Sequence, residues 1–278
     1  MTPISPLDLF PGKLLVVAPH MDDELLACGG VMALLPQKQD IHVVYATDGM
    51  KSPAPIMAQD AITPDLGERR EQESVAAMAL LGVPEANLHF LRLPEAELTQ
   101  HILPLRRQLL DCIMAIRPDH ILLPFRYDRH PDHLAINRTL TTAREEGAFM
   151  AQLVEYFVYY RWRLLPGGDV RQYIRPPYLL EVETSSVAAL KRQALDCFTS
   201  QTTIFYPWQT RPILTPQLLD DTAATPEYFL RYEEEMGGTA VFTHLVPWIK
   251  IAHRLEPFLQ KRKYLLGASL KRRLRKRP

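Results

Sequence analysis

The sequence predicts an α/β fold built on a largely parallel sheet, and three features of its first half indicate this. Short apolar runs rich in Val, Ile and Leu alternate with longer helical segments, a pattern typical of strands joined by crossover helices. The first run, residues 14–18, is apolar at every position, as strands buried on both faces are. Polar residues gather directly after two of the runs, where open α/β sheets bind their ligands.

Four strands are predicted in the first half of the chain. The first covers residues 14–18 and is ended by Pro19, which has no N–H to donate to a neighbouring strand. The others cover residues 40–47, 87–93 and 120–124. A helical segment follows each strand, and this alternation favours parallel pairing.

The helices are predicted between these strands, at residues 25–35, 67–81, 96–116 and from Pro131 onward. Gly82 follows the second helix as a C-terminal cap, and Pro104 is expected to kink or break the third. Pro131 suits the first position of a helix, where its missing N–H costs nothing. Residues 50–66 hold three prolines and few regularly spaced apolar residues, so we expect a long loop over the site.

The second half of the chain has a less regular pattern. Residues 153–160 and 178–182 are predicted to be strands, and residues 185–198 a helix. The proline-rich residues 200–226 are expected to form an irregular cover, and residues 226–235 a short helix.

The charge of the chain is balanced overall but unevenly distributed. Residues 261–278 hold nine of the 32 Lys and Arg and none of the 32 Asp and Glu, so the rest carries a net charge of −9. We therefore expect a single α/β domain over residues 1–260 and a basic tail over residues 261–278. The tail, which follows an amphipathic segment at 248–259, is either a solvated end or a peripheral contact with an anionic membrane surface. A nucleic-acid partner is not expected, because the tail lacks a series of interleaved base-stacking aromatic residues.

The cysteine content indicates a reducing compartment, and the hydropathy pattern indicates a soluble protein. Cys28, Cys112 and Cys197 are odd in number and widely spaced, so they fit neither a disulfide framework nor a cysteine zinc site. We find no charged N-terminal region followed by an apolar one, and no apolar run approaching about 18 residues. A soluble, cytoplasmic protein is therefore expected.

The first polar cluster lies at the end of the first strand. His20, Asp22, Asp23 and Glu24 fall within five positions, and burying four ionisable groups is costly unless a partner such as a divalent cation compensates them. His20 and Asp23 are three residues apart, so one helical turn can direct both to the same point. Asp22 points elsewhere, which leaves it free to contact a water on the metal. The alternative is a helix N-terminus decorated with acids, although a histidine gains nothing from the helix dipole there.

The second polar cluster, His130 with Asp132 and His133, follows the fourth predicted strand in the same way. Two loops of one parallel sheet can converge, so His20, Asp23 and one of the two later histidines would form a two-His-one-carboxylate site. This ligand set suits catalytic zinc and equally non-haem Fe(II). The alternative is a polar helix start with a surface pair of histidines. No Gly-rich dinucleotide or P-loop pattern follows the first strand, which argues against a nucleotide cofactor.

Both clusters resemble the motifs of one protein family. Pro-His-Met-Asp-Asp-Glu at 19–24 and His-Pro-Asp-His at 130–133 resemble the PIG-L/LmbE-like de-N-acetylase family, and the likeness extends over about 15–235. Met21 departs from the proline common in that family, at a position that carries no metal ligand. Weaker agreement lies at Thr47-Asp48-Gly49, Arg69-Arg70-Glu71, residues 191–201 and Glu227-Tyr228-Phe229.

The resemblance implies a Rossmann-like fold and the zinc-dependent hydrolysis of an N-acetyl group, usually on a glucosamine-containing substrate. Carried over by motif position, His20, Asp23 and His133 would bind the zinc, with Fe²⁺ or another divalent metal as the alternative. Asp22 would be the general base that takes a proton from the attacking metal-bound water.

The resemblance also implies roles for the residues around this metal. A protonated His130 would polarise the acetyl oxygen or stabilise the oxyanion, with Asp132 beside it tuning its charge. Arg69 and Arg129 would contact the substrate. Some relatives have a tyrosine two residues before the first histidine of the second motif, where this chain has Asp128.

The expected partner is an N-acetylated sugar or glycoconjugate, including a lipid-linked one. Two alternatives remain open at this point. One is an amidase that acts on a non-sugar or thiol-conjugate amide. The other is a non-catalytic sugar-binding protein of the same fold, which a broken ligand set would indicate; in this sequence every ligand and the base are intact.

Overall fold

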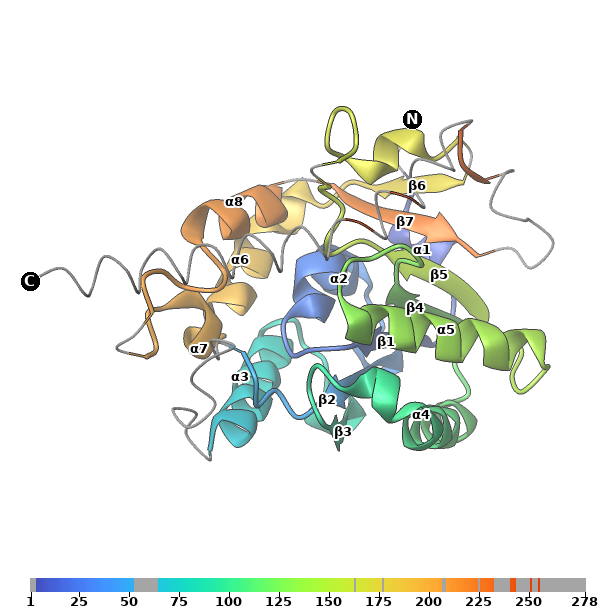
Figure 1. Cartoon of the computed structure of the whole chain (residues 1–278), viewed down its shortest axis with the longest axis horizontal. Coiled ribbons are helices and arrows are strands. Elements are labelled where there is room, and N and C mark those ends of the chain that lie inside the picture. Colours follow the sequence, from blue (N-terminus) through green and yellow to red (C-terminus); the bar gives the residue numbers. More distant parts are fainter. Residues whose placement is uncertain are drawn as a thin grey trace, which may run out of the picture.

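The structure is a computed structural model, in which helices surround a central sheet (Figure 1). It describes residues 4–52, 65–162, 164–176, 178–206, 209–224, 226–232, 241–243, 251 and 255. Most of the predicted loop over the site lies outside the described residues, and so do the basic tail and nearly all of the amphipathic segment before it.

The described residues form a seven-stranded sheet in the order β3-β2-β1-β4-β5-β7-β6. The strands are β1 (Leu14–Ala18), β2 (Ile41–Thr47), β3 (Leu88–Leu93), β4 (His120–Pro124), β5 (Gln152–Tyr156), β6 (Leu179–Val182) and β7 (Glu227–Arg231). β1 to β5 run parallel, whereas β7 pairs antiparallel with β5 and β6. At the centre, Val16 pairs with Val43 of β2 and Leu122 of β4. The expected largely parallel sheet is confirmed.

Helices cover both faces of the sheet, as predicted (Figure 1). One face carries α2 (Asp23–Leu34), α3 (Leu66–Leu80), α6 (Ala188–Asp196) and α8 (Pro216–Ala224). The other carries α4 (Ile102–Ile116) and α5 (Pro131–Glu145). Two single-turn helices, α1 (Pro6–Leu9) and α7 (Thr199–Thr202), complete the set that the structure describes.

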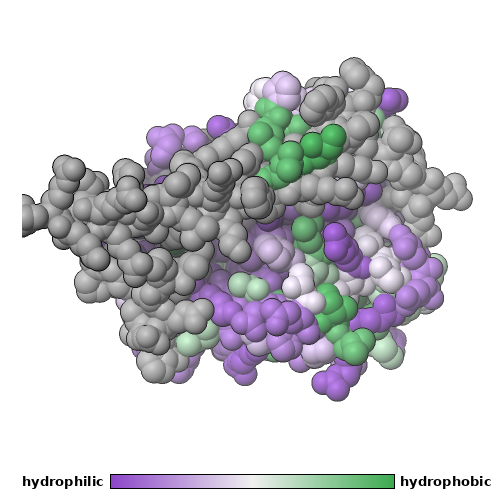
Figure 2. Space-filling model, viewed as in Figure 1, coloured by the Kyte–Doolittle hydropathy of each residue, from purple (hydrophilic) through white to green (hydrophobic). Residues whose placement is uncertain are grey.

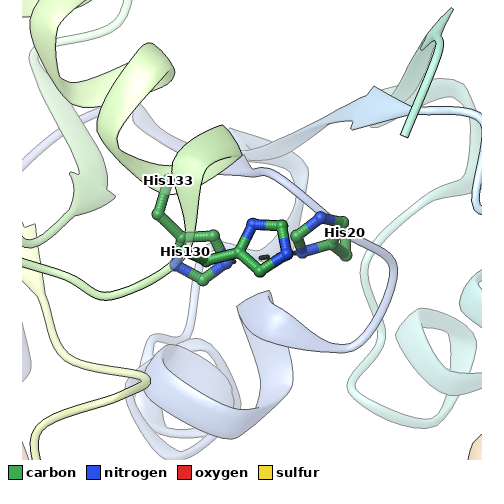
Figure 3. Close-up of side chains that lie close together, drawn as sticks. All are labelled: His20, His130 and His133. Atoms are coloured by element: carbon green, nitrogen blue, oxygen red, sulfur yellow. Dashed lines mark hydrogen bonds between the residues drawn. The ribbon is translucent and has the colours of Figure 1, made fainter. Parts of the chain in front are cut away.

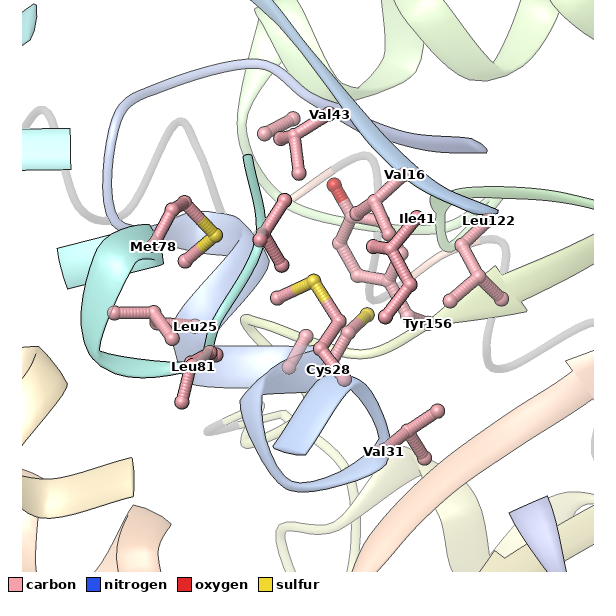
Figure 4. Packing of buried hydrophobic residues seen from close by; sticks show 14 of the residues in the cluster. Val16, Leu25, Cys28, Val31, Ile41, Val43, Met78, Leu81, Leu122 and Tyr156 are labelled. Atoms are coloured by element: carbon pink, nitrogen blue, oxygen red, sulfur yellow. The ribbon is translucent and has the colours of Figure 1, made fainter. Parts of the chain in front are cut away.

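Each central strand sends alternate side chains into two separate cores. Val16 of β1 packs with Cys28, Met78 and Tyr156 under α2 and α3 (Figure 4). Its neighbour Val17 packs into the opposite cluster, under α4 and α5. Both faces of the strand are therefore buried, which explains why the run from 14 to 18 is apolar throughout.

Residues 227–231 form strand β7, and the predicted helix at 226–235 is wrong. Phe229 pairs with Tyr156 of β5 on one side and with Leu180 of β6 on the other. Phe229 and Leu230 are both fully buried. Pairing with two strands distant in sequence outweighs local helix preference, and such pairing cannot be read from a short window.

Two further boundaries differ from the prediction. Helix α8 lies within residues 200–226, which were expected to be irregular; Pro216 begins it, at a position where proline is favoured. Strand β5 ends at Tyr156, whereas the prediction continued it to residue 160. The chain leaves the sheet there, and the backbone N–H of Tyr159 donates to Asp128 instead (3.3 Å).

Pro104 does not break its helix, because α4 begins at Ile102 and the proline lies in the first turn, where N–H groups have no intrahelical partner. The three cysteines are free thiols, with Cys28 buried in the core and the other two partly buried, as predicted. Figure 2 shows one face of the molecule, on which the described residues are largely hydrophilic, with hydrophobic ones in small groups. Among the described residues, no helix combines the length and apolar character that crossing a membrane requires.

Candidate active site

The two predicted clusters meet where the order of the strands reverses. β1 pairs with β2 on one side and with β4 on the other, and the residues that follow β1 and β4 are those of the two motifs. Ligands of open α/β sheets bind at such a switch point, outside the carboxyl ends of the strands. The rings of His20, His130 and His133 lie together there (Figure 3).

Three side-chain atoms converge at this point. Asp23 Oδ2 lies 3.0 Å from His20 Nδ1 and 3.2 Å from His133 Nε2, and the two histidine nitrogens are 3.4 Å apart. Ligands of a tetrahedral zinc, bonded at 2.0–2.1 Å, stand about 3.3 Å from one another. All three side chains are at least nine-tenths buried. Two imidazoles and a carboxylate at this spacing fit a divalent metal.

His130 belongs to the same cluster. Its ligand nitrogen and those of His20 and His133 lie within 4.8 Å of one another. Its ring stands edge-on to that of His20, with centroids 4.5 Å apart. The contacts of Asp23 favour His133 over His130 as the second histidine of the ligand set, because Asp23 lies against His20 and His133.

Each of the two buried histidines also contacts a second carboxylate. Asp132 Oδ2 lies 3.2 Å from His20 Nε2, and Asp128 Oδ2 lies 3.2 Å from His133 Nδ1. Carboxylates behind metal-binding histidines fix the tautomer and the orientation of the ring. Asp132 was expected to tune the charge of His130, and its charge does oppose the lowering of that pKa. Its carboxylate contacts His20 and accepts the N–H of Ala96 (2.6 Å).

Burial and neighbouring charges set the protonation of this cluster. Burial works to lower the pKa of His133, but Asp128 and Asp23 raise it to about 9. Burial works to raise the pKa of Asp23, but the two histidines hold it well below its usual range. Asp23 is therefore ionised at neutral pH when it faces these two histidines.

His130 is in the opposite situation. Burial, followed by the charges of His20 and His133, lowers its pKa to about 3. The backbone N–H of Asp132 donates to His130 Nδ1 (3.3 Å), so the ring proton of the neutral form belongs on Nε2. The surroundings thus favour a neutral Nε2–H donor over the protonated His130 expected from the resemblance.

Asp22 has an unusual backbone, with φ at 138°, a region that non-glycine residues rarely occupy. Its carboxylate Oδ2 lies 3.8 Å from Nη2 of the buried Arg70. Burial raises the pKa of Asp22 to about 7, against the opposing charge of Arg70. Strained residues cluster at functional sites, and a carboxylate tuned to neutral pH is suited to general-base work.

Arg70, rather than Arg69, reaches the site. Arg70 donates to the carbonyl oxygen of Met21 (2.8 Å) and so supports the turn between His20 and Asp23. The guanidinium of Arg69 lies over the ring of Phe205 (4.9 Å) and donates to Thr199 (3.3 Å). The contacts of Arg69 are thus with α7 and with the ring of Phe205, and its contact with a substrate stays a prediction.

Two tyrosines lie near the second motif, and neither is at the position that some relatives use, two residues before its first histidine. Tyr127 packs against Phe242 in a core cluster, with ring centroids 5.5 Å apart. Tyr159 lies beside the site, its ring centroid 5.5 Å from that of His133. The guanidinium of Arg129 lies over the ring of Tyr159 at 5.7 Å, which keeps it next to the cluster.

Sequence reasoning missed the supporting residues Arg70, Asp128 and Glu24. Arg70 and Asp128 were visible as neighbours of assigned residues, but spacing alone could not show which side chain turns inward. Glu24 is fully buried and accepts hydrogen bonds from the N–H of Asp22 (3.0 Å) and from Tyr45 Oη (3.1 Å). Burial raises the pKa of Glu24 to about 8, and the residue supports the turn from beneath.

Comparison with known proteins gives one family and several solved structures of the same fold. The family described as PIG-L, GlcNAc-PI de-N-acetylase, matches residues 15–144. No curated protein matches the sequence.

The solved structures cover most of the chain at low identity. The conserved protein TT1542 of Thermus thermophilus is 22% identical over 84% of this chain and all of its own, with a TM-score of 0.58. The N,N'-diacetylchitobiose deacetylase of Pyrococcus horikoshii is 18% identical over 81% of this chain and 85% of its own, with a TM-score of 0.55. The 4-carboxy-2-hydroxymuconate hydratase of Pseudomonas putida is also 18% identical, over 81% of this chain and all of its own, with a TM-score of 0.52.

These identities show a shared fold, and the hydratase shows that the fold hosts more than one chemistry. The family match covers both polar motifs, at 19–24 and 130–133. The resemblance to the PIG-L/LmbE-like family is therefore confirmed over residues 15–144, and the shared fold extends the likeness over most of the chain.

Proposed function

We propose that the protein is a zinc-dependent hydrolase that removes an N-acetyl group from an amino-sugar substrate. The observation that carries this proposal is the convergence of His20 Nδ1, Asp23 Oδ2 and His133 Nε2 within 3.0–3.4 Å of one another, beside Asp22. A two-His-one-carboxylate set with an open position is typical of catalytic zinc, and Fe²⁺ is the alternative metal.

The metal held by these residues would act as a Lewis acid toward the amide carbonyl and lower the pKa of a water to about 7. Asp22, with its pKa raised to about 7, takes the proton from the attacking water at a carboxylate oxygen. Arg70 limits the rotation of that carboxylate through its contact at 3.8 Å.

His130 acts on the developing negative charge. Its Nε2–H, set by the hydrogen bond at Nδ1, donates to the oxygen of the tetrahedral intermediate. Asp132 and Asp128 hold His20 and His133 in orientation from behind. Arg129, which lies over the ring of Tyr159 beside the cluster, contacts the sugar hydroxyls in this proposal.

An N-acetylated sugar is the substrate class that the comparisons support best. The matched family is described by its action on GlcNAc-PI, and one structural relative is named for its action on N,N'-diacetylchitobiose. The rivals are another amide, including a thiol conjugate, a hydration reaction of the kind named for the Pseudomonas relative, and sugar binding without turnover.

A substrate panel tests the proposal. Acetate release by the zinc-loaded protein is measured on N-acetylglucosamine, its oligomers, its nucleotide-sugar form and lipid-linked forms, with Asp22→Asn as the blank. Release from one class above the blank supports the proposal and identifies the substrate class. Failure to release acetate from every member, with one zinc bound per chain, would contradict it and favour one of the three rivals.

A further inference from the structure

A cavity of about 150 Å³ lies beside the candidate site. It is bounded by α2, by α8 and by the segment that leaves β5, and its apolar lining includes Leu26, Ala27, Phe157, Ile213 and Leu218. None of these residues has a part in the proposed hydrolysis.

The cavity adjoins the metal-ligand cluster through two elements. Ala27 of its lining is four residues after Asp23 on α2, so the two side chains share one face of that helix. Tyr159, which also lines the cavity, has its ring centroid 5.5 Å from that of His133. The cavity therefore lies about one helical turn from the cluster.

The floor of the cavity is a buried ion pair whose hydrogen-bonding capacity is taken up. Lys191 Nζ donates to Glu227 Oε1 (2.8 Å) and to the carbonyl oxygens of Leu26 (3.1 Å) and Thr222 (3.2 Å). Glu227 also accepts the backbone N–H groups of Gly30 (2.6 Å) and Val31 (2.8 Å). All three Lys191 donors are used, so the floor offers little to a polar ligand.

The rim of the cavity is apolar and partly open to solvent. Ile213, Leu218 and Tyr159 are 44%, 42% and 40% exposed. Arg171, the remaining charged residue of the lining, pairs with Asp169 (2.7 Å) and lies over the ring of Tyr160 (3.7 Å). The rim is apolar and partly exposed, and the polar groups of the floor already have hydrogen-bond partners. Such a cavity suits an apolar ligand.

We propose that this cavity binds an apolar group, aliphatic or aromatic, that the amide substrate carries next to its reacting centre. A cavity of this volume holds about six carbon atoms, since a 150 Å³ apolar cavity accommodates benzene. This inference rests on the proposed hydrolysis for its substrate and extends it: the substrate is an amphiphilic amide. The apolar group is attached either through the sugar or as the acyl chain of the amide.

The test compares substrates that differ only in their apolar group. kcat/KM is measured for the methyl, hexyl and phenyl glycosides of N-acetylglucosamine, and for N-hexanoylglucosamine against N-acetylglucosamine. We expect the matching apolar compound to exceed its small counterpart by about 10-fold or more, because one buried methylene is already worth about 10-fold. A preference among the glycosides identifies attachment through the sugar, and a preference for the hexanoyl amide identifies the acyl chain.

Two variants at the rim test whether the preference for the apolar compound depends on the cavity. Leu218→Glu and Ile213→Glu place a charge at the rim and should reduce the apolar-to-small ratio at least several-fold. Leu80→Glu is the matched control, because Leu80 is 46% exposed on α3 and is absent from the cavity lining, and it should leave the ratio unchanged. Equal kcat/KM for all compounds in the unmodified protein would overturn the inference while leaving the hydrolysis intact.

Calorimetric titration of the hexyl glycoside into Asp22→Asn protein separates the two proposals. Binding that Leu218→Glu weakens and Leu80→Glu does not would support the cavity even if no compound is hydrolysed. Equal affinity of the hexyl and methyl glycosides, together with equal affinity of N-hexanoylglucosamine and N-acetylglucosamine, would overturn it.

Discussion

His20 has an acidic partner on each ring nitrogen, Asp23 at Nδ1 (3.0 Å) and Asp132 at Nε2 (3.2 Å). Because both ring nitrogens have a partner, the His20 ring has a single orientation. Its Nδ1 is therefore directed at the point where Asp23 and His133 meet. The sequence could predict the pair at three-residue spacing, but it could not predict that Asp132, 112 residues away, would be the partner of His20.

Asp132→Asn should therefore weaken metal binding by about 10- to 100-fold while leaving the fold intact, because the orienting carboxylate of a metal-binding histidine is lost. The measurement is the zinc dissociation constant in competition with a chelator. Asp220→Asn, on the exposed part of α8, is the control. An unchanged constant in Asp132→Asn would show that the contact with His20 does not support the metal.

Asp22→Asn should retain one zinc per chain and lose acetate release by about 100-fold or more, which is the usual contribution of a positioned general base. Metal content and initial rate are measured on the same sample. A near-normal rate would remove Asp22 from the base role, and a loss of zinc would make it a ligand.

At the scale of elements, the first and second halves of the chain are joined through α2. Lys191 of α6 and Glu227 of β7 form a buried pair (2.8 Å) that reaches the middle of α2. Lys191 donates a hydrogen bond to the carbonyl oxygen of Leu26, and Glu227 accepts one from the N–H of Gly30. In a regular α-helix this carbonyl and this N–H bond to each other. A Cβ at Gly30 would lie 2.5 Å from Thr184 Cγ2, so only glycine permits this approach. Residues 191 and 227 lie in two of the weaker stretches of family likeness.

Glu227→Gln should lower the free energy of unfolding by about 3–5 kcal/mol, because it leaves the Lys191 charge buried without its partner. Chemical denaturation measures this loss. Arg192→Ala is the control: its partners Asp196 and Asp220 are both solvent-exposed, and a change within about 1 kcal/mol is expected. A loss no larger than that of Arg192→Ala would show that the pair does not hold the two halves together.

At the scale of the whole molecule, the strands that could be predicted are those whose pattern is visible within a short stretch of sequence. β1, β2, β3 and β4 are rich in apolar residues and alternate with helical segments, which identifies them without knowledge of their partners; β1 and β4 are buried at every position. β7 was not predictable, because its identity depends on pairing with β5 and β6. The meeting of the two polar motifs was predictable because each follows a strand at helical spacing, whereas the contacts of Asp128, Arg70 and Glu227 depend on which side chains turn inward in the folded chain.

The basic tail, residues 261–278, gives a further prediction that belongs to the whole chain. Nine basic residues near an anionic surface contribute about 1 kcal/mol each, so the full chain should co-sediment with phosphatidylserine vesicles at low salt. A chain ending at Leu259 should not. Equal sedimentation of the two would exclude a role for the tail in membrane contact.

The most direct test of the central claim is to titrate zinc into the metal-free protein and measure acetate release from the best substrate of the panel at each step. We predict that the rate rises in proportion to bound zinc up to one per chain. His133→Ala, which removes a ligand, should show neither tight binding nor release. A rate independent of zinc occupancy, or full activity in His133→Ala, would contradict the account.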